Sequence, residues 1–411
     1  MQIDNLIASQ PAVEQKNVEV TIVDRDRFLK MIETAADFTA KTDNVPVLQN
    51  IFFQIKKEVP KRTAEGMVKV PGNALFLIAN DGTHTIAQGI ATEEGQSSVI
   101  EATGELETML PKAFADLVAK LPAKQSLKLE FSNDRLNIQS GRSSYELVLT
   151  ATEQFPQPKP EQAKPFVISS KEFCAALKNA ITFVDPKNSG ALQGVHIMGT
   201  PKGLLIESCD RTQGYRELLQ GAAENVDITI VKDTVNRICS TFDKKDTKIA
   251  VVVGESSLTI NGDGKSLICS FLDAKYPDLS KMTFEEFAAN AVVDTKEMIE
   301  MLSRTLLYQS AKGASTNPAI VSLKNGVLLV NVSSAIGKSE EAVELSDSSG
   351  EIRLGLDASK MISALKCFTD YEKTTIRFKS PLEVLSLQPV GGNDELHKTA
   401  FMLPVRVAQG V

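Results

Sequence analysis

The feature that most constrains the fold of this chain is an internal repeat. Six times along 411 residues, an apolar strand-like segment is followed by a short polar step and then by apolar residues at helical spacing. The intervals between successive copies are 86, 59, 62, 63 and 63 residues. The repeat therefore predicts six copies of one structural unit, anchored on the first inward-facing helical residues Phe28, Phe114, Phe173, Val235, Met298 and Met361.

Local signals support the repeat. Four residues before an anchor stand Asp24, Ser169, Asp294 and Asp357, whose side chains are typical helix N-caps. The one long interval contains the polar, Pro- and Gly-bearing segment 56–73, which we interpret as a loop inserted between two strands.

Each helical segment is followed by alternating or continuous apolar runs that end at Asn, Asp or Gly, so each unit is predicted to be one strand, one helix and about three antiparallel strands. A sheet covered by helices on one face must pair with a second unit to bury itself. We therefore predict an α+β fold of three alike domains, 18–160, 161–283 and 284–411, after a loose N-terminal extension, 1–17. Linkers are predicted at 154–165 and 278–289.

The composition offers little for catalysis. The five cysteines are far apart and the three histidines isolated, which argues against a disulfide framework, a metal site or a cofactor and fits a reducing cytosol. No phosphate-binding glycine motif appears. Asp210 could act as an acid or base, although a turn role is favoured. No apolar run approaches a membrane span, and the first residues lack the pattern of a secretion signal.

Basic residues recur in the helical segments although the net charge is −7. Any one pair is typical of a solvated helix face, and acidic neighbours such as Asp116 and Glu300 support that interpretation. Six units placed edge to edge would nevertheless align these cations toward phosphates without base stacking. The residues are Arg27, Lys30, Lys112, Lys120, Lys171, Lys178, Lys232, Arg237, Lys296, Arg304, Lys360 and Lys366.

The chain resembles the bacterial-type DNA sliding clamp, the DNA polymerase III beta subunit family, over residues 18–407. The resemblance depends on the order and spacing of several motifs together with the six repeats. These motifs are VPVLQN (45–50), SGRSSYELVLTATEQFP (139–155), LQGVHI (192–197), 210–216, KYPDLSKM (275–282), SALKCF (363–368) and FMLPVRV (401–407).

The resemblance implies a non-enzymatic, cytoplasmic processivity factor. In this family two chains join head to tail into a ring of six domains, with helices inside and antiparallel sheets outside. The implied homodimer encircles double-stranded DNA independently of sequence and tethers the replicative DNA polymerase. The clamp loader, repair polymerases and ligase-type proteins would dock through linear motifs.

The resemblance also implies site residues. The family's peptide groove matches Leu192, Cys209, Pro277, Lys281, Met282, Leu382, Val384, Met402, Leu403, Pro404, Val405 and Arg406. Gly214, Tyr215 and Arg216 join them only if three residues are inserted after Asp210. The 402–405 stretch could alternatively be plain edge-strand packing. The implied dimer interface is Arg142, Tyr145, Leu147, Leu307 and Tyr308, and the implied DNA-contacting loops contain Lys41 and Lys187.

Two alternatives remain at this stage. One is a divergent clamp of a phage or mobile element with restricted partners, motivated by the departures near Asp210 and in 56–73. The other is an enzyme on a repeat β-rich scaffold, which requires a cluster of titratable side chains in a pocket.

Overall fold

The computed structural model describes residues 17–42, 45–63, 66–93, 99–122, 125–149, 155–156, 163–185, 187–221, 226–282, 286–309, 318–391 and 398–407. The predicted N-terminal extension, apart from its last residue, lies outside these ranges. The chain divides into two compact units, Met1–Ser170 with Lys245–Ser270 (unit 1) and Lys171–Lys244 with Phe271–Val411 (unit 2), and each is described by itself.

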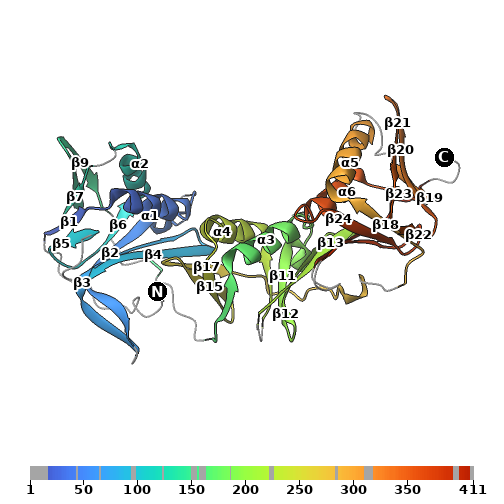
Figure 1. Cartoon of the computed structure of the whole chain (residues 1–411). Helices are drawn as coiled ribbons and strands as arrows, with labels where there is room; N and C mark the ends of the chain where they lie inside the picture. The colour runs from blue at the N-terminus through green and yellow to red at the C-terminus, as the bar shows by residue number, and fades with distance from the viewer. Residues whose placement is uncertain are drawn as a thin grey trace. The chain divides into compact units, whose positions relative to one another are not determined.

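The six predicted repeats are present in the described part of the chain, each as a strand, a helix and at least three further strands. The first and fifth repeats each have one additional short strand, β5 (Ile100–Ala102) and β22 (Ser348–Ser349). All six anchor residues are at most 2% exposed, which confirms the predicted inward stripe of each helix. The carboxylates of Asp24, Asp294 and Asp357 accept backbone N–H groups of the helices that follow them. The helices are α1 (Arg25–Asp37), α2 (Lys112–Lys120), α3 (Ser170–Ile181), α4 (Lys232–Phe242), α5 (Thr295–Gln309) and α6 (Ala358–Lys366) (Figure 1).

Unit 1 contains two antiparallel sheets. The five-stranded sheet has the order β5 (Ile100–Ala102), β1 (Val18–Ile22), β7 (Leu127–Ser132), β8 (Arg135–Ser140) and β9 (Ser143–Val148). The eight-stranded sheet has the order β10 (Phe166–Ser169), β15 (Lys248–Val253), β16 (Ser257–Gly262), β17 (Lys265–Ser270), β4 (His84–Glu93), β3 (Gly66–Asn80), β2 (Asn50–Thr63) and β6 (Leu106–Pro111).

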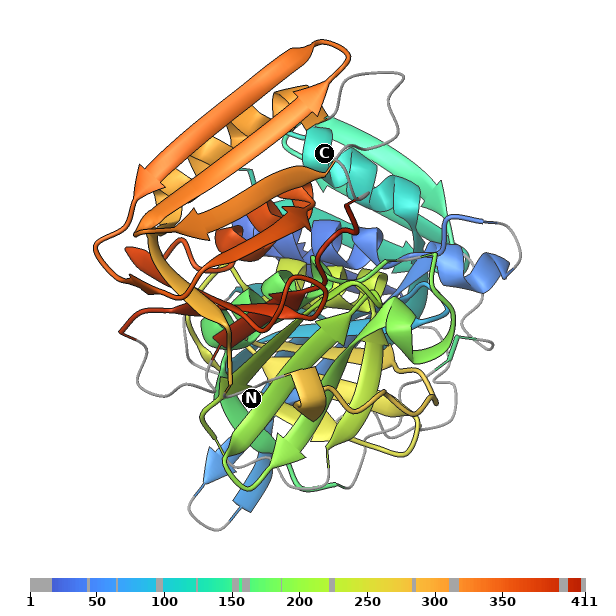
Figure 2. The ribbon, with the colours of Figure 1, turned by 90° about the vertical axis from the view of Figure 1, so that its right-hand side faces the viewer.

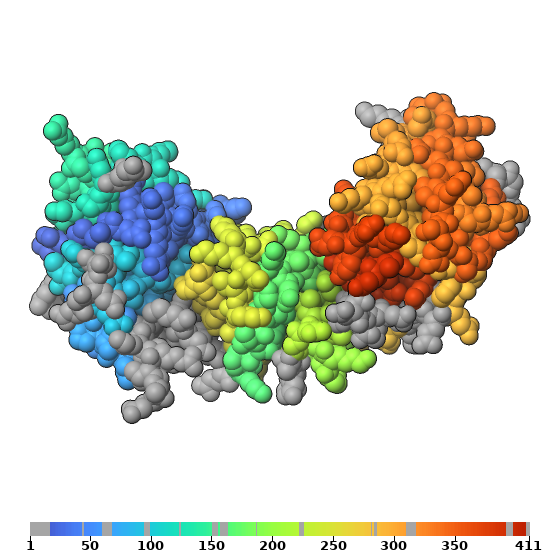
Figure 3. All heavy atoms as spheres, in the orientation of Figure 1, coloured from blue at the N-terminus to red at the C-terminus, as the bar shows by residue number. Residues whose placement is uncertain are grey.

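Unit 2 also contains two antiparallel sheets. The nine-stranded sheet has the order β14 (Asp227–Val231), β11 (Gly194–Thr200), β12 (Gly203–Cys209), β13 (Gln213–Leu219), β26 (Lys398–Met402), β25 (Leu385–Pro389), β24 (Lys373–Phe378), β18 (Ala289–Asp294) and β22 (Ser348–Ser349). The four-stranded sheet has the order β21 (Gly337–Glu344), β20 (Val327–Ser334), β19 (Ala319–Lys324) and β23 (Ile352–Leu356). In Figure 2 these last strands (orange) lie against α5, and in Figure 3 β20 and β21 reach the surface of the unit.

Repeats pair by exchanging their first strands. β1 of the first repeat lies beside β7 of the second, while β6 of the second lies beside β2 of the first. The same exchange joins β10 to β15 and β14 to β11, and then β18 to β24 and β23 to β19. Neither member of a pair can complete its sheets alone, which is the physical reason for pairing. The domain boundaries at 160 and 283 stay predictions, since the two large sheets each combine strands from both sides of one boundary.

The interpretation of 56–73 as a loop is wrong. β2 and β3 continue as a paired hairpin as far as Thr63 and Gly66, with a β-bulge between Lys56 and Glu58. The bulge interrupts the alternation of apolar and polar residues, because it changes the face of the sheet to which the later side chains point. Val59 packs there with Ala74 and Phe76, so this extension has a small core of its own.

The helices of unit 1 are joined by an aromatic contact and by a buried cation. The rings of Phe28 in α1 and Phe114 in α2 meet edge to face with centroids 6.2 Å apart. Arg25 is 5% exposed, and its guanidinium donates to the carbonyls of Val118, Leu121 and Pro122 at the end of α2. The start of α1 thereby supplies hydrogen-bond donors to carbonyls at the end of α2.

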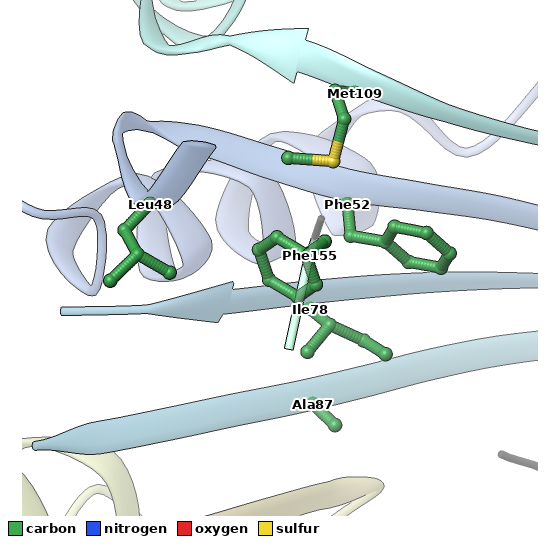
Figure 4. Packing of buried hydrophobic residues seen from close by; sticks show 6 residues of the cluster. All are labelled: Leu48, Phe52, Ile78, Ala87, Met109 and Phe155. Carbon is green, nitrogen blue, oxygen red and sulfur yellow. The ribbon is translucent and has the colours of Figure 1, made fainter. Parts of the chain in front are cut away.

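One buried cluster in unit 1, beside the eight-stranded sheet, is wholly apolar. Leu48, Phe52, Ile78, Ala87, Met109 and Phe155 form a buried cluster (Figure 4). The ring of Phe155 stacks on that of Phe52 at 5.4 Å between centroids and 22° between planes. Unit 2 has an equivalent position on its nine-stranded sheet, where the side chains are different.

Candidate partner-binding site

A second cluster of buried residues lies in unit 2, at the ends of β12 and β26. We name it the Tyr276 cluster. Three partly buried residues, Leu192, Ala274 and Met282, pack against it. Its buried members are Ala191, Cys209, Tyr276, Leu279, Val384 and Phe401. The cluster thus joins η2 (Gly190–Gln193), three strand ends and the segment leading to η3 (Ser280–Met282).

Two exposed leucines border the Tyr276 cluster in sequence. Leu382 is 75% exposed and stands two residues before Val384. Leu403 is 45% exposed and follows β26 directly, with its N–H donating to the carbonyl of Thr212 at 2.7 Å. Exposed large apolar side chains beside an apolar cluster are typical of a surface that binds another protein segment.

The face of the sheet that carries the cluster follows from strand alternation. Gly214 and Phe401 are register partners on β13 and β26, and the ring of Phe401 occupies the space that a side chain at 214 would need. Tyr215 points to the opposite face, where it has no exposed surface and stacks on Phe183. Met402, register partner of Gln213, is 1% exposed on that same opposite face. Tyr215 and Met402 therefore lie on the face of the sheet opposite to the Tyr276 cluster, apart from the other residues expected in the groove.

The turn between β12 and β13 explains the position of Tyr215. The Asp210 N–H donates to the Gln213 carbonyl, and only Asp210, Arg211 and Thr212 lie between the two strands. Arg211 has φ 79°, a left-handed conformation that favours glycine. The turn at Asp81 in unit 1 has the same length, with the Asp81 N–H donating to the His84 carbonyl and Gly82 (φ 99°) directly after Asp81. The turn at Asp210 therefore contains no three-residue insertion relative to its counterpart in unit 1.

Asp210 has the turn role favoured from the sequence. Its Oδ1 accepts from the N–H groups of Thr212 and Gln213 at 2.9 Å each, and Lys360 of α6 lies 3.8 Å from its Oδ2. Burial acts to raise the pKa of Asp210, but the hydrogen bonds from Thr212 and Gln213, together with Lys360, hold it below its ordinary value.

A network of charged residues supports the Tyr276 cluster, and the sequence analysis missed it. His196 Nδ1 is 3.2 Å from Glu207 Oε1, and His196 Nε2 is 2.9 Å from Asp227 Oδ1. Glu207 Oε2 accepts from Arg216 Nε at 2.8 Å. The four residues come from four different strands, so sequence spacing alone gave no sign of them; only the strand registers bring them together.

The network touches the cluster through one aromatic pair. The rings of His196 and Tyr276 stack with centroids 4.6 Å apart and planes 10° apart. The hydroxyl of Tyr276 accepts from the Cys209 N–H at 2.9 Å. Burial, with Cys209 next in size, raises the pKa of Tyr276 far above its ordinary value, and burial raises the pKa of the Cys209 thiol. Both side chains are therefore neutral at physiological pH, which does not favour a nucleophilic role.

The other residues expected in the groove are placed as follows. Leu192, Cys209, Met282 and Val384 come together in the Tyr276 cluster. Arg216 lies on the same face but is engaged by Glu207. Pro277 and Arg406 are exposed, Pro404 and Val405 are half-buried, and the side chain of Lys281 lies outside the described part of the chain. Ala191, Ala274, Tyr276, Leu279 and Phe401 were missed, although alternation in 401–403 would have indicated Phe401 rather than Met402.

The predicted helix cations are mostly at the surface. Arg237 and Lys360 are half-buried, and the other ten, with the loop residues Lys41 and Lys187, are exposed. Lys178 is engaged by Asp243, Lys360 by Asp210, and Arg304 by Glu341 through two hydrogen bonds of 2.8 and 2.9 Å.

The residues expected at a dimer interface also lie at the surface. β9 is the last strand of its sheet, so within the described ranges one of its edges has no strand partner. Tyr145 on β9 is 37% exposed, and Leu307 on α5 is 70% exposed. Arg142 is exposed, whereas Leu147 and Tyr308 are half-buried. An open edge with exposed apolar side chains is suited to pairing with another chain.

Comparison with known proteins accounts for this architecture. No protein-family model matches the chain. The Beta sliding clamp of Halalkalibacterium halodurans is 24% identical over 399 residues, covering 94% of this chain and 99% of the relative. The Staphylococcus epidermidis Beta sliding clamp is 22% identical over 399 residues, covering 93% and 98%. This chain is a homologue of the beta sliding clamps.

Solved clamp structures agree with that homology. The DNA polymerase sliding clamp of Bacillus subtilis superposes with a TM-score of 0.83 at 19% identity, covering 95% of this chain and all of the other. The Pseudomonas aeruginosa sliding clamp bound to griselimycin gives a TM-score of 0.81 at 16% identity, with the same coverage. The α+β sliding-clamp fold expected from the motifs is confirmed. None of the helices in the described ranges is long and apolar enough to cross a membrane.

Proposed function

We propose that this chain is a sliding clamp that encircles duplex DNA as a homodimer and tethers the replicative DNA polymerase, conferring processivity. The observation that carries the proposal is similarity to clamps from end to end, 94% of this chain against 99% of the relative, with the clamp fold throughout. A cytoplasmic location and the absence of catalysis belong to the same proposal.

The mechanism follows from topology rather than from tight binding. A closed ring leaves DNA only by opening or by reaching an end, so its cations need not hold any sequence register. Exposed lysines and arginines facing phosphates attract the duplex without specifying position, which permits sliding. A polymerase docked on the ring is then kept at high effective concentration near the primer end. The exposed cations on all six helices and those at Lys41 and Lys187 are the proposed DNA-facing set.

A topological experiment tests this function. We expect the protein, after a clamp loader has acted, to remain on nicked circular DNA during gel filtration and to leave when the circle is linearised. Equal retention on circular and linear DNA would contradict encirclement.

The dimer interface is proposed to include Arg142, Tyr145, Leu147, Leu307 and Tyr308. Light scattering should give about twice the chain mass of 44.6 kDa. Leu307→Asp should yield a monomer that is not retained on circular DNA, whereas Val167→Asp, at another apolar side chain that is 60% exposed, should not. A wild-type monomer or trimer would contradict the proposed head-to-tail dimer.

The Tyr276 cluster, with Leu382 and Leu403, is the proposed docking site for linear motifs of the polymerase, the clamp loader, and repair polymerases and ligase-type proteins. An adaptable surface of Leu, Met and aromatic side chains suits short apolar motifs. Griselimycin, with which the Pseudomonas aeruginosa clamp was crystallised, is a practical probe. Leu382→Asp and Leu403→Asp change exposed side chains and should abolish its binding without unfolding the protein. Unchanged affinity in both variants would remove the assignment.

A specialised clamp of a phage or mobile element, with restricted partners, is the second candidate. The extended β2–β3 hairpin, with its own small core, favours it because it lengthens the interval between the first two repeats beyond the others. Pull-down of the host polymerase separates the two: capture indicates a general clamp, and failure with a competent loader indicates a restricted one.

A further inference from the structure

One row of side chains in unit 2 has an internal counterpart in unit 1. Both follow a short 3-10 helix, η1 (Pro46–Gln49) or η2, and both border a hairpin whose turn is made in the same way. In unit 1, Asp81 Oδ1 accepts from the N–H groups of Thr83 and His84, as Asp210 Oδ1 does from Thr212 and Gln213. The two hairpins are therefore equivalent, and their registers can be compared residue by residue.

An apolar row of side chains in unit 1 corresponds to a polar and charged row in unit 2. Across β6, β2, β3 and β4, register partners are Met109, Phe52, Ile78 and Ala87. Across β14, β11, β12 and β13, the equivalent partners are Thr229, His196, Glu207 and Arg216. An aromatic ring stacks on the second member of each row, Phe155 in unit 1 and Tyr276 in unit 2. The apolar row shows that this sheet position needs no charge for folding.

Buried charges are a poor means of adding stability, because desolvation offsets much of the attraction between them. Glu207 and His196 are 3% and 5% exposed. Both nitrogens of His196 face carboxylate oxygens, so only the doubly protonated ring donates to Glu207 and Asp227 together. These two bonds fix the plane of the ring, and with it the platform on which Tyr276 lies. The charged row therefore orients the ring of His196, and with it the ring of Tyr276 that stacks on it.

We propose that His196, held by Glu207 and Asp227, is a positioning residue that fixes Tyr276 in the partner-binding site, so that the affinity of the site for peptides depends on the charge of His196. The inference rests on the proposed docking function of the Tyr276 cluster. Tyr276 transmits the effect because its hydroxyl holds the Cys209 N–H at the end of β12.

The direction of the pH dependence follows from the groups around His196. Those that face it are Glu207 on β12, Asp227 on β14 and Tyr276, with Arg216 and Cys209 one contact further. Burial acts to lower the pKa of His196, but the hydrogen bonds from the ring to Glu207 and Asp227 outweigh it and raise the pKa above its ordinary value. The ring is then charged at low pH, and peptide affinity should be lost as the pH rises through that raised pKa. Tyr276 and Cys209 titrate above their ordinary ranges, so they do not compete in this window.

The test uses three variants of the full-length protein. His196→Phe keeps an aromatic ring beside Tyr276 but removes both hydrogen bonds that fix the plane of that ring. Asp227→Asn removes one carboxylate at a side chain that is 80% exposed, so the fold is preserved. Asp273→Asn, an equal charge change at an exposed position three residues before Tyr276, is the matched control.

Calorimetry with griselimycin from pH 6 to pH 9 is the first readout. We expect wild-type affinity to fall about tenfold across this range, a typical coupling between two sites. His196→Phe should be pH-independent, Asp227→Asn should move the midpoint to lower pH, and the control should follow wild type. A purely structural role for His196 would not shift a midpoint in Asp227→Asn. Identical pH profiles in wild type and His196→Phe would overturn the proposal.

The rate of Cys209 alkylation by iodoacetamide, followed by peptide mass spectrometry at one pH near 7, is the second readout and needs no ligand. Loss of the Tyr276 hydrogen bond should make Cys209 label several-fold faster in His196→Phe than in wild type, while buried Cys269 in unit 1 keeps its rate. If griselimycin binds neither protein at any pH, the docking function fails, and this labelling alone decides whether His196 fixes Tyr276. Equal Cys209 rates would then overturn the inference.

Discussion

The ring of Phe401 lies over the backbone of Gly214, its register partner on the neighbouring strand. A β-carbon at 214 would come within 2.3 Å of Phe401 Cζ and 2.7 Å of the Ser208 carbonyl oxygen. The absence of a side chain at this position allows Phe401 to join Tyr276 and Cys209 in one cluster. The geometry of the Tyr276 cluster, the proposed docking site, thus depends on the absence of a β-carbon at position 214.

Gly214→Ala should therefore damage the site. The backbone oxygen cannot move aside as a flexible side chain can, so we expect a destabilisation of about 1–3 kcal/mol from overpacking. We also expect weaker griselimycin binding, measured by calorimetry below the melting transition. Gly104→Ala is the control, because a β-carbon there meets only Val18 Cγ2 at 3.4 Å. Equal stability and affinity in the two variants would mean that Phe401 is not held against Gly214.

The contact of Arg25 with the end of α2 leads to a second prediction. Arg25→Ala leaves the carbonyls of Val118 and Leu121 without their 2.8 and 2.7 Å donors in a buried setting. Hydrogen bonds from a charged donor contribute about 1.5–3 kcal/mol, so denaturant unfolding should show a loss of roughly that size. Arg27→Ala, on the exposed face of the same helix, should change stability by less than about 0.5 kcal/mol. A similar loss of stability in both variants would show that it comes from replacing an arginine of α1 and not from the bonds between Arg25 and the end of α2.

Arg25 and His196 make contacts that could not be predicted from the sequence. The helices, their anchors and their caps could be predicted because each depends on residues within one or two turns of one another. Arg25 was not singled out from the sequence, and His196 was interpreted as an isolated histidine, because their partners lie 93 to 97 and 11 to 31 residues away. Strand exchange between repeats was hidden for the same reason: local pattern predicts a strand but not its neighbour.

The positions of Tyr215 and Met402, away from the Tyr276 cluster, have a different explanation. In a strand, a shift of one residue moves a side chain to the opposite face, so the assumed insertion after Asp210 was enough to misplace Tyr215. In the C-terminal motif, the consecutive residues from Met402 to Arg406 were expected in the groove without regard to strand alternation, and Phe401 was left out. Only the alternate residues Phe401 and Leu403 avoid the buried face occupied by Met402.

Stability at low pH should depend on Asp81. Burial acts to raise the pKa of Asp81, but the hydrogen bonds from His84 and Thr83 lower it far below its ordinary value. A depressed carboxyl pKa contributes stability above the unfolded value, near 4, and loses it as the pH falls toward the folded value. Wild type should therefore lose about 1 kcal/mol more than Asp81→Asn between pH 6 and pH 3, measured by urea unfolding. Asp263→Asn, at a turn between β16 and β17, should titrate like wild type.

Ion pairing on α5 distinguishes two of the proposed DNA-facing cations. Both Lys296 and Arg304 are exposed, but Arg304 is held by two hydrogen bonds to Glu341 of β21, which also raise its pKa. A cation already neutralised by a carboxylate releases fewer counterions when a phosphate approaches. Lys296→Gln should therefore reduce the salt dependence of binding to a short DNA duplex by nearly one unit of slope, and Arg304→Gln by clearly less. Glu341→Gln should act in the opposite direction and increase the slope, because it releases Arg304 toward DNA. Equal slopes for Lys296→Gln and Arg304→Gln, together with no change in Glu341→Gln, would show that the α5 face does not meet the phosphates.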